Sequence, residues 1–119
     1  MSGTNNIVDL IEAGIRAESL RQKAIANNVA NLETPGYRRV DVRFEELLAK
    51  CLNSSGKVDL TEVEPQIYQP RETPVKSNGN DVDYEVEVGR MIKNAIRHKA
   101  LIRLLSKKYS QIEQAIGPR

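Results

Sequence analysis

Apolar residues in the first quarter of the chain recur at helical spacing and predict a long helix over residues 6–32. One stripe of this helix, interrupted by Glu18 and Gln22, consists of Ile7, Ile11, Ile15, Ile25, Val29 and Leu32. A second line, made mostly of small residues, consists of Leu10, Ala13, Ala17, Leu20 and Ala24. A surface helix needs only one apolar face, so two narrow faces indicate more than one packing partner.

The end of this helix is marked by Thr34, Pro35 and Gly36. Proline disfavours the helical conformation in the residue before it, and Pro35 suits the second position of a turn. Gly36 tolerates the positive φ that the next turn position requires. The sequence therefore predicts that the helix stops here and the chain turns.

Residues 37–80 have a different pattern, without a long periodic stripe. Val40, Val42 and Phe44 alternate as in a short strand, and residues 44–52 have the spacing of a short helix. Scattered apolar residues and prolines follow, which predicts short strands and loops with partial disorder.

The last segment, residues 83–116, predicts a second long helix, with Asn80 or Asp81 as its N-cap. The predicted seam of this helix consists of Val88, Ile92, Ala95, Ile102, Leu105, Tyr109, Ile112 and Ile116. Spacings of three, four and seven residues are typical of a left-handed supercoiled seam. Gly117 and Pro118 are expected to end the helix.

The lengths of the two helices indicate the fold class. Helices of 27 and 34 residues extend about 40 and 50 Å at 1.5 Å per residue. Such rods can pack as an antiparallel coiled-coil hairpin, which makes the expected fold mainly α with a small irregular middle region. The corresponding divisions are residues 1–36, 37–80 and 81–119. Faces left over from the hairpin need partners, as in a subunit of a helical or ring-shaped assembly, although a simple dimer fits the same pattern.

Composition argues against an enzyme. The 119 residues carry a net charge of +2, with one cysteine, one histidine and only 4% aromatic residues. A zinc site, a haem clip or a histidine-based triad needs more ligands of these types, so we expect no metal, no cofactor and no catalytic residues. No secretory signal and no apolar run long enough to span a membrane is visible, so neither is expected.

Segments at both ends of the chain resemble bacterial flagellar rod and hook proteins. Residues 26–39, ANNVANLETPGYRR, are similar to the N-terminal signature of that family, often written NNIANxxTPGY(K/R). Residues 40–45 are similar to the DVDFE continuation found in its proximal rod members. Residues 78–87 resemble their GNxVDxxxE entry to the C-terminal helix, and residues 104–109 and 115–116 resemble their ending.

The resemblance covers residues 7–52 and 76–116, and the small size of the chain favours a proximal rod protein. It implies a structural subunit of the flagellar basal-body rod, located in the periplasm and exported through the flagellar type III apparatus without a cleaved signal. The implied partners are copies of itself, FlgC-type rod proteins, the rod–ring adaptor FliE, the ring protein FliF and the export gate.

The implied assembly motif consists of Asn27, Asn28, Ala30, Asn31, Thr34, Pro35, Gly36 and Tyr37. Asparagine is unfavourable inside a helix because its amide competes for backbone groups. Two interpretations of the three asparagines stay open: hydrogen bonds between neighbouring subunits, and local capping where the helix ends.

Basic residues along the last helix raise the alternative of a nucleic-acid-binding helical hairpin; they are Arg90, Lys93, Arg97, Arg103, Lys107 and Lys108. A charged face is usually only solvated, and few aromatic rings are present to stack on bases, so nucleic acid is not an expected partner. A small-molecule substrate is not expected either. His98 is interpreted as a packing residue and Cys51 as an inert thiol. Another flagellar rod protein of similar size and a cytoplasmic export chaperone or adaptor are the remaining alternatives.

Overall fold

A computed structural model describes residues 3–53 and 63–117 of the chain. The elements follow in the order α1 (Gly3–Ala30), β1 (Asp41–Arg43), α2 (Glu45–Leu52), β2 (Gln66–Tyr68) and α3 (Tyr84–Ile116). The predicted mainly-α fold, with two long terminal helices and a small middle region, is confirmed. The short strand and short helix predicted after residue 40 are also present as β1 and α2. Disorder is predicted for part of the middle region. Residues 54–62 of that region lie outside the described residues.

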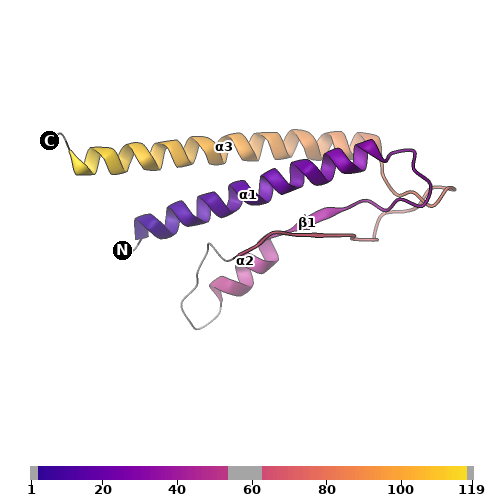
Figure 1. The fold of residues 1–119 in the computed structure, drawn as a ribbon, viewed down its shortest axis with the longest axis horizontal. Coiled ribbons are helices and arrows are strands. Elements are labelled where there is room, and N and C mark those ends of the chain that lie inside the picture. Colours follow the sequence, from indigo (N-terminus) through magenta and orange to yellow (C-terminus); the bar gives the residue numbers. More distant parts are fainter. Residues whose placement is uncertain (1–2, 54–62, 118–119) are drawn as a thin grey trace.

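The two long helices run antiparallel and pack along their length, so that both chain ends lie at the same end of the molecule (Figure 1). We call this the open end of the hairpin and the opposite end, where the chain leaves α1 and enters α3, the closed end. The molecule is a flat, elongated body with extents of 65, 33 and 14 Å. In Figure 1, α1 lies between α3 on one side and the middle region on the other.

The second, small-residue face of α1 finds its partner within the same chain. Ala13 and Ala17 are fully buried and pack with Phe44 and Val63 in the hydrophobic core. Side chains from α2 pack around this cluster; they are Leu47, Leu48 and Cys51. Small residues suit this face because they let the middle region approach α1 closely. The small-residue face predicted for α1 therefore packs on the middle region, while α1 also packs on α3.

A two-stranded antiparallel sheet holds the middle region together. Strands β1 and β2 pair with Val42 opposite Ile67. Val42 is buried while Ile67, its partner on the same face of the sheet, is exposed, so β1 lies against α1 and β2 lies farther out. This sheet places the start of α2 beside the middle of α1.

The N-cap predicted for the second long helix is wrong by two to three residues. Helix α3 begins at Tyr84, and its N-cap is Asp83, whose carboxylate accepts a hydrogen bond from the backbone N–H of Val86 at 3.3 Å. Asn80 and Asp81 do not cap α3 because their side chains are used in other contacts, described below. The C-terminal prediction is confirmed at Gly117, which has a φ of 77° and ends the helix.

The predicted seam of α3 is also wrong for its packing on α1. Five of its positions are exposed, four of them to between 44% and 56%: Ile92, Ala95, Ile102, Tyr109 and Ile116. We call these five residues the outer stripe. Val88, Leu105 and Ile112 are half-buried, and the buried residues of α3 are Glu87 and Asn94.

On α1 the predicted stripe is closer to the observed seam. Ile11 and Ile25 are buried, and Ile7 is exposed. Ile15, Val29 and Leu32 are half-buried. The physical reason for the error on α3 is that polar residues occupy its inward face, where a hydrophobic pattern does not detect them. Leu101 adds an apolar contact to the same face, with its Cδ1 positioned 3.2 Å from where a Cβ on Gly14 would lie.

Candidate functional site

At the closed end, two segments far apart in the sequence form one junction. The turn after α1 has Tyr37 N–H bonded to Thr34 O at 3.2 Å, and Gly36 in it has a φ of 75°. The Gly36 N–H donates to Asn78 O at 2.9 Å, which joins this turn to the one before α3. A Cβ on Gly79 would lie 3.4 Å from the Gly36 Cα, so the two turns are in close contact. The two halves of the rod-protein signature therefore meet in space.

Asn28 is the centre of this junction and is fully buried. Its amide nitrogen donates to Val40 O at 2.9 Å and to Glu87 Oε1 at 3.0 Å. Its carbonyl oxygen accepts from Val40 N–H and from the Tyr37 hydroxyl, both at 2.9 Å. An asparagine side chain has two donor hydrogens and two acceptor lone pairs, so every position is used. The hydrogen bonds of Asn28 are thus all made within the chain, which supports its local interpretation.

The other two asparagines of the motif support the capping interpretation. Asn31 donates from its side chain to Asn27 O at 2.8 Å and accepts from the Thr34 hydroxyl at 3.1 Å. Asn27, which is exposed, donates to the Tyr37 hydroxyl at 2.7 Å. These bonds close the end of α1 locally. The remaining motif positions are all exposed; they are Ala30, Thr34, Pro35 and Gly36.

Asn80 caps the end of α1 rather than the start of α3. Its side-chain amide donates to the carbonyl oxygens of Asn31 at 2.9 Å and Thr34 at 2.8 Å. Its side-chain oxygen accepts from Val82 N–H at 2.7 Å. Asn80 is fully buried, and it satisfies backbone carbonyls that a helix leaves unpaired at its C-terminal end.

A buried ionic network completes the junction. Glu87 is fully buried, and its Oε2 accepts from Arg39 Nε at 2.9 Å and from Arg90 Nη1 at 2.8 Å. Asp81, also buried, accepts from the Arg39 backbone N–H and from Arg38 Nε. Buried charges need such partners, because removing one leaves the other without compensation. The network links the start of α3 to the residues that follow the turn.

Sequence reasoning assigned no role to Arg39 and Glu87. A signal was nevertheless present: two arginines follow the turn directly, and acidic residues crowd the start of α3. Pairing these two charge clusters would have predicted the junction.

The Tyr37 hydroxyl lies inside this network, and burial raises the pKa of its phenol above the ordinary value, a shift that the Asn27 hydrogen bond opposes and the charge of Glu87 supports. Ionisation would remove the proton that Tyr37 donates to Asn28. The junction therefore requires the neutral phenol.

A second polar contact crosses the middle of the hairpin. Glu18 is buried on α1, and Asn94 of α3 donates to its backbone carbonyl at 2.8 Å. Arg21 donates two hydrogen bonds to Glu18 at 3.0 Å and pairs with Glu45 at the start of α2. His98 lies half-buried on the same seam, 3.5 Å from the Ser19 hydroxyl, consistent with a packing histidine.

The Arg21–Glu45 pair changes the proton affinity of both groups. Burial is the largest single effect and opposes the charge on each group. The hydrogen bonds and opposite charges around each group together outweigh it, so the pKa of Arg21 is raised and the pKa of Glu45 is lowered. The pair links α2 to α1 close to Asn94 of α3.

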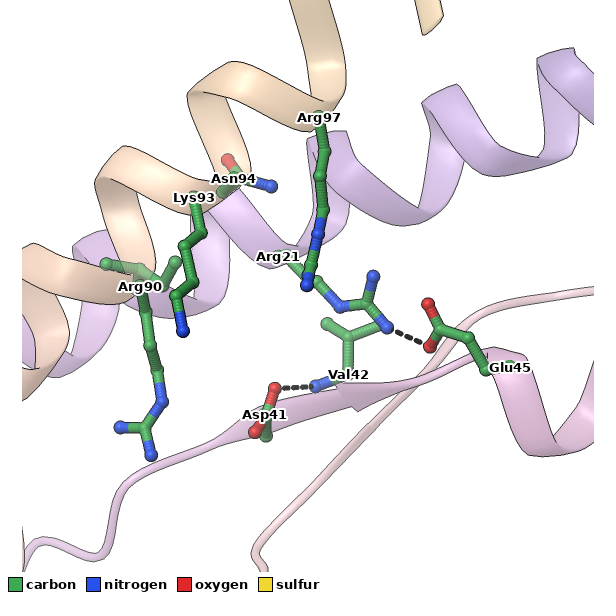
Figure 2. Close-up of a pocket in the computed structure, with 9 residues that line it drawn as sticks. Arg21, Asp41, Val42, Glu45, Arg90, Lys93, Asn94 and Arg97 are labelled. Carbon is green, nitrogen blue, oxygen red and sulfur yellow. Dashed lines mark hydrogen bonds and ion pairs between the residues drawn. The ribbon is translucent and has the colours of Figure 1, made fainter. Parts of the chain in front are cut away.

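Beside this contact lies an open groove of about 480 Å³ between α3 and the β1–α2 segment, with α1 as its floor. Figure 2 shows Arg90, Lys93 and Arg97 extending from α3 across from Asp41 and Glu45. Arg103 and Lys107 of the predicted basic face are exposed, and Lys108 is half-buried.

Residues 3–53 and 63–117 contain no cluster of His, Cys, Asp or Glu side chains arranged to hold a metal ion. No helix in the described part of the chain is both long and apolar enough to cross a membrane.

The hairpin, the junction and the outer stripe define a helical protein in which two terminal segments close one end and one helix keeps an apolar face uncovered. The sequence profile of the family described as "Flagella basal body rod protein" matches residues 13–38, which run from the middle of α1 through the turn.

Curated relatives extend the match over most of the chain. The "Flagellar basal body rod protein FlgB" of Borrelia hermsii is 30% identical over 73% of this chain and 78% of the relative. The protein of that name from Bacillus subtilis (strain 168) is 26% identical over 98% of this chain and 97% of the relative. The protein of that name from Borreliella burgdorferi is 27% identical over 82% of this chain and 86% of the relative. The chain belongs to the FlgB family of flagellar basal body rod proteins. It is thus a member of a family of structural proteins of the bacterial flagellum.

Proposed function

We propose that this chain is a structural subunit of the proximal rod of the flagellar basal body and that it self-assembles through its terminal helices. Residues 1–36 and 81–119 would form the rod core, with the middle region packed beside them. The observation that carries the proposal is the outer stripe of α3. Ile92, Ile102 and Tyr109 are exposed along a helix whose buried residues, Glu87 and Asn94, are polar.

Assembly would remove the outer stripe from water. Apolar surface removed from water contributes about 25 cal/mol per Å², so covering a row of large aliphatic side chains favours association. Exposed apolar rows of this kind are typical of surfaces that bind another protein. A subunit packed among neighbours in a rod would cover the stripe along its length.

The proposed neighbours are other copies of the chain, FlgC-type rod proteins, the rod–ring adaptor FliE and the ring protein FliF. Delivery through the type III export gate, without a cleaved signal, would bring the chain to a rod in the periplasm. The family membership supports these partners as a class, and the flat, elongated shape of the chain suits lateral packing in a tube.

The basic residues of α3 give little support to nucleic-acid binding. Of the six basic residues named on α3, Arg90 is paired with the buried Glu87, so it contributes little to phosphate contacts. The chain has only 4% aromatic residues, which leaves few rings beside the exposed cations to stack on bases.

Two experiments test the proposal in flagellated cells. Electron tomography of cells lacking the gene should show membrane rings without a rod. Replacing Ile102 by Asp should likewise leave no rod, because it puts a charge into the outer stripe while the side chain is exposed in the folded chain. Gln114→Asp adds the same charge at an exposed position of α3 outside the stripe and should leave rods intact. Complete rods in the deletion strain would refute the proposal.

A further inference from the structure

The groove beside α1 carries positive charge that the described part of the chain does not neutralise. Lys93 has no carboxylate within 4 Å among residues 3–53 and 63–117. Arg97 is 59% exposed, and its side chain approaches Glu18 only to 3.9 Å. Arg90 already forms an ion pair with Glu87. Arg21 already forms ion pairs with Glu18 and Glu45.

The acidic residues on the opposite wall do not neutralise the charges of Lys93 and Arg97. Glu45 is engaged with Arg21, and Asp41 lies 3.4 Å from Arg39. In Figure 2, Lys93 and Arg97 extend from α3 into the space above β1. The groove therefore presents two available cations next to each other.

An apolar hollow adjoins this basic part. It is lined by Gly14 and Ala17 of α1, Phe44 before α2, and Ala100 and Leu101 of α3. Arg21, Glu45 and Arg97 line both hollows, so the two hollows adjoin each other as neighbouring parts of the groove. A segment that fits it combines carboxylates with apolar side chains.

The first turn of α3, with its cap, has this composition. Asp83 and Glu85 alternate with Tyr84 and Val86, and all four residues are exposed, Tyr84 to 54% and Val86 to 44%. Among the described residues, no other segment alternates two exposed acidic residues with two exposed large apolar ones. This turn lies at the closed end of the hairpin, next to the loops that join the long helices to the middle region (Figure 1).

We propose that the first turn of α3 in one copy docks into the groove of a second copy, with Glu85 facing Lys93 and Arg97. The inference rests on the proposed self-assembly and names one of its contacts. The two surfaces differ, so the contact is heterologous. Such contacts do not close as a two-fold dimer, and they repeat into an open helical filament when successive copies are displaced along the axis. Lys93 lies eight residues beyond Glu85 on α3, so neighbouring copies would be displaced along the hairpin by about 12 Å.

Charge reversal with rescue tests this contact in cells whose own gene is replaced by each variant. Lys93→Glu and Glu85→Lys change exposed side chains without an ion pair among the described residues, so each variant should fold normally. Each single change should lower the amount of the protein in isolated basal bodies by about tenfold or more, because like charges then meet across the contact. The double variant restores opposite charges and should recover at least about half of the wild-type amount.

Arg103→Glu is the matched control, because it reverses an exposed charge on α3 outside the groove, and it should assemble normally. Single variants that assemble like the wild type, or a double variant no better than either single, would overturn the docking proposal while leaving the rod assignment intact. Absence of the wild-type protein from basal bodies would overturn the proposed function itself, and the docking contact with it.

Discussion

Helices α1 and α3 are of similar length, 28 and 33 residues, but they are held in opposite ways. Helix α1 is covered on two sides and buries mostly apolar residues, namely Ile11, Ala13, Ala17, Ala24 and Ile25. Helix α3 is covered on one side, and its buried residues are Glu87 and Asn94. Apolar burial therefore anchors α1, whereas buried polar contacts position α3 and leave the outer stripe exposed.

The buried polar contacts of α3 also affect how α3 is aligned along α1. Glu87 meets Asn28 on α1, and Asn94 meets the backbone and carboxylate of Glu18. A shift of α3 by one turn would separate both pairs and leave buried charge unpaired. Polar groups at single seam positions are known to fix the register of paired helices at some cost in stability. We infer that the two polar contacts select one alignment of the hairpin.

The largest effect is expected for removing the polar anchor of α3. Glu87→Ala removes the buried carboxylate that lies 2.9 Å from Arg39 and leaves this guanidinium only Asp41 at 3.4 Å, so it should lower the free energy of unfolding by about 3–5 kcal/mol. Urea unfolding of the purified chain measures this value. Glu85→Ala removes an exposed carboxylate from the same turn and should change stability by less than about 0.5 kcal/mol. Equal values for the two variants would show that the junction contributes no stability.

A smaller change in the free energy of unfolding should distinguish the packing of α1 from that of α3. Ala17→Leu overfills the contact of α1 with Phe44 and Val63 and should cost about 1–3 kcal/mol. The same substitution at Ala95, which is exposed on α3, should change the free energy of unfolding by less than about 0.5 kcal/mol. Thermal unfolding monitored by circular dichroism compares the two variants. If Ala95→Leu were the more damaging change, the contrast drawn between the helices would be wrong.

The sequence predicted the fold well because both long helices have clear periodic patterns and end signals. Pro35 and Gly36 stop the first helix, and Gly117 ends the second, as their backbone preferences require. The short strand and helix near Val42 and Leu47 also follow from alternation and spacing. These features depend on residues close together in the chain, which is where local patterns are informative.

The face of α3 that meets α1 could not be predicted in this way. A hydrophobic pattern assumes that apolar residues point inward, whereas here Glu87 and Asn94 do so and the outer stripe does not. The role of Asn80 was likewise hidden, because it caps a helix 50 residues earlier in the chain rather than the one that follows it. Both errors come from contacts between distant segments, which spacing alone does not encode.

The smallest effect concerns the hydroxyl that joins α1 to the turn at the closed end. Tyr37→Phe removes the bonds to Asn27 and Asn28 and should cost about 0.5–1.5 kcal/mol at pH 8. The pKa of Tyr37 is raised in the folded chain, so its contribution is fully present below the unfolded value of 10.0 and is lost as the pH rises toward and through the folded value. The stability difference between the wild type and Tyr37→Phe should therefore shrink between pH 9.5 and pH 11, which urea unfolding at each pH measures. Tyr109→Phe, at an exposed position of the outer stripe, provides the control and should show no such narrowing. A difference that stayed constant across this range would mean that the phenol does not stabilise the junction through its proton.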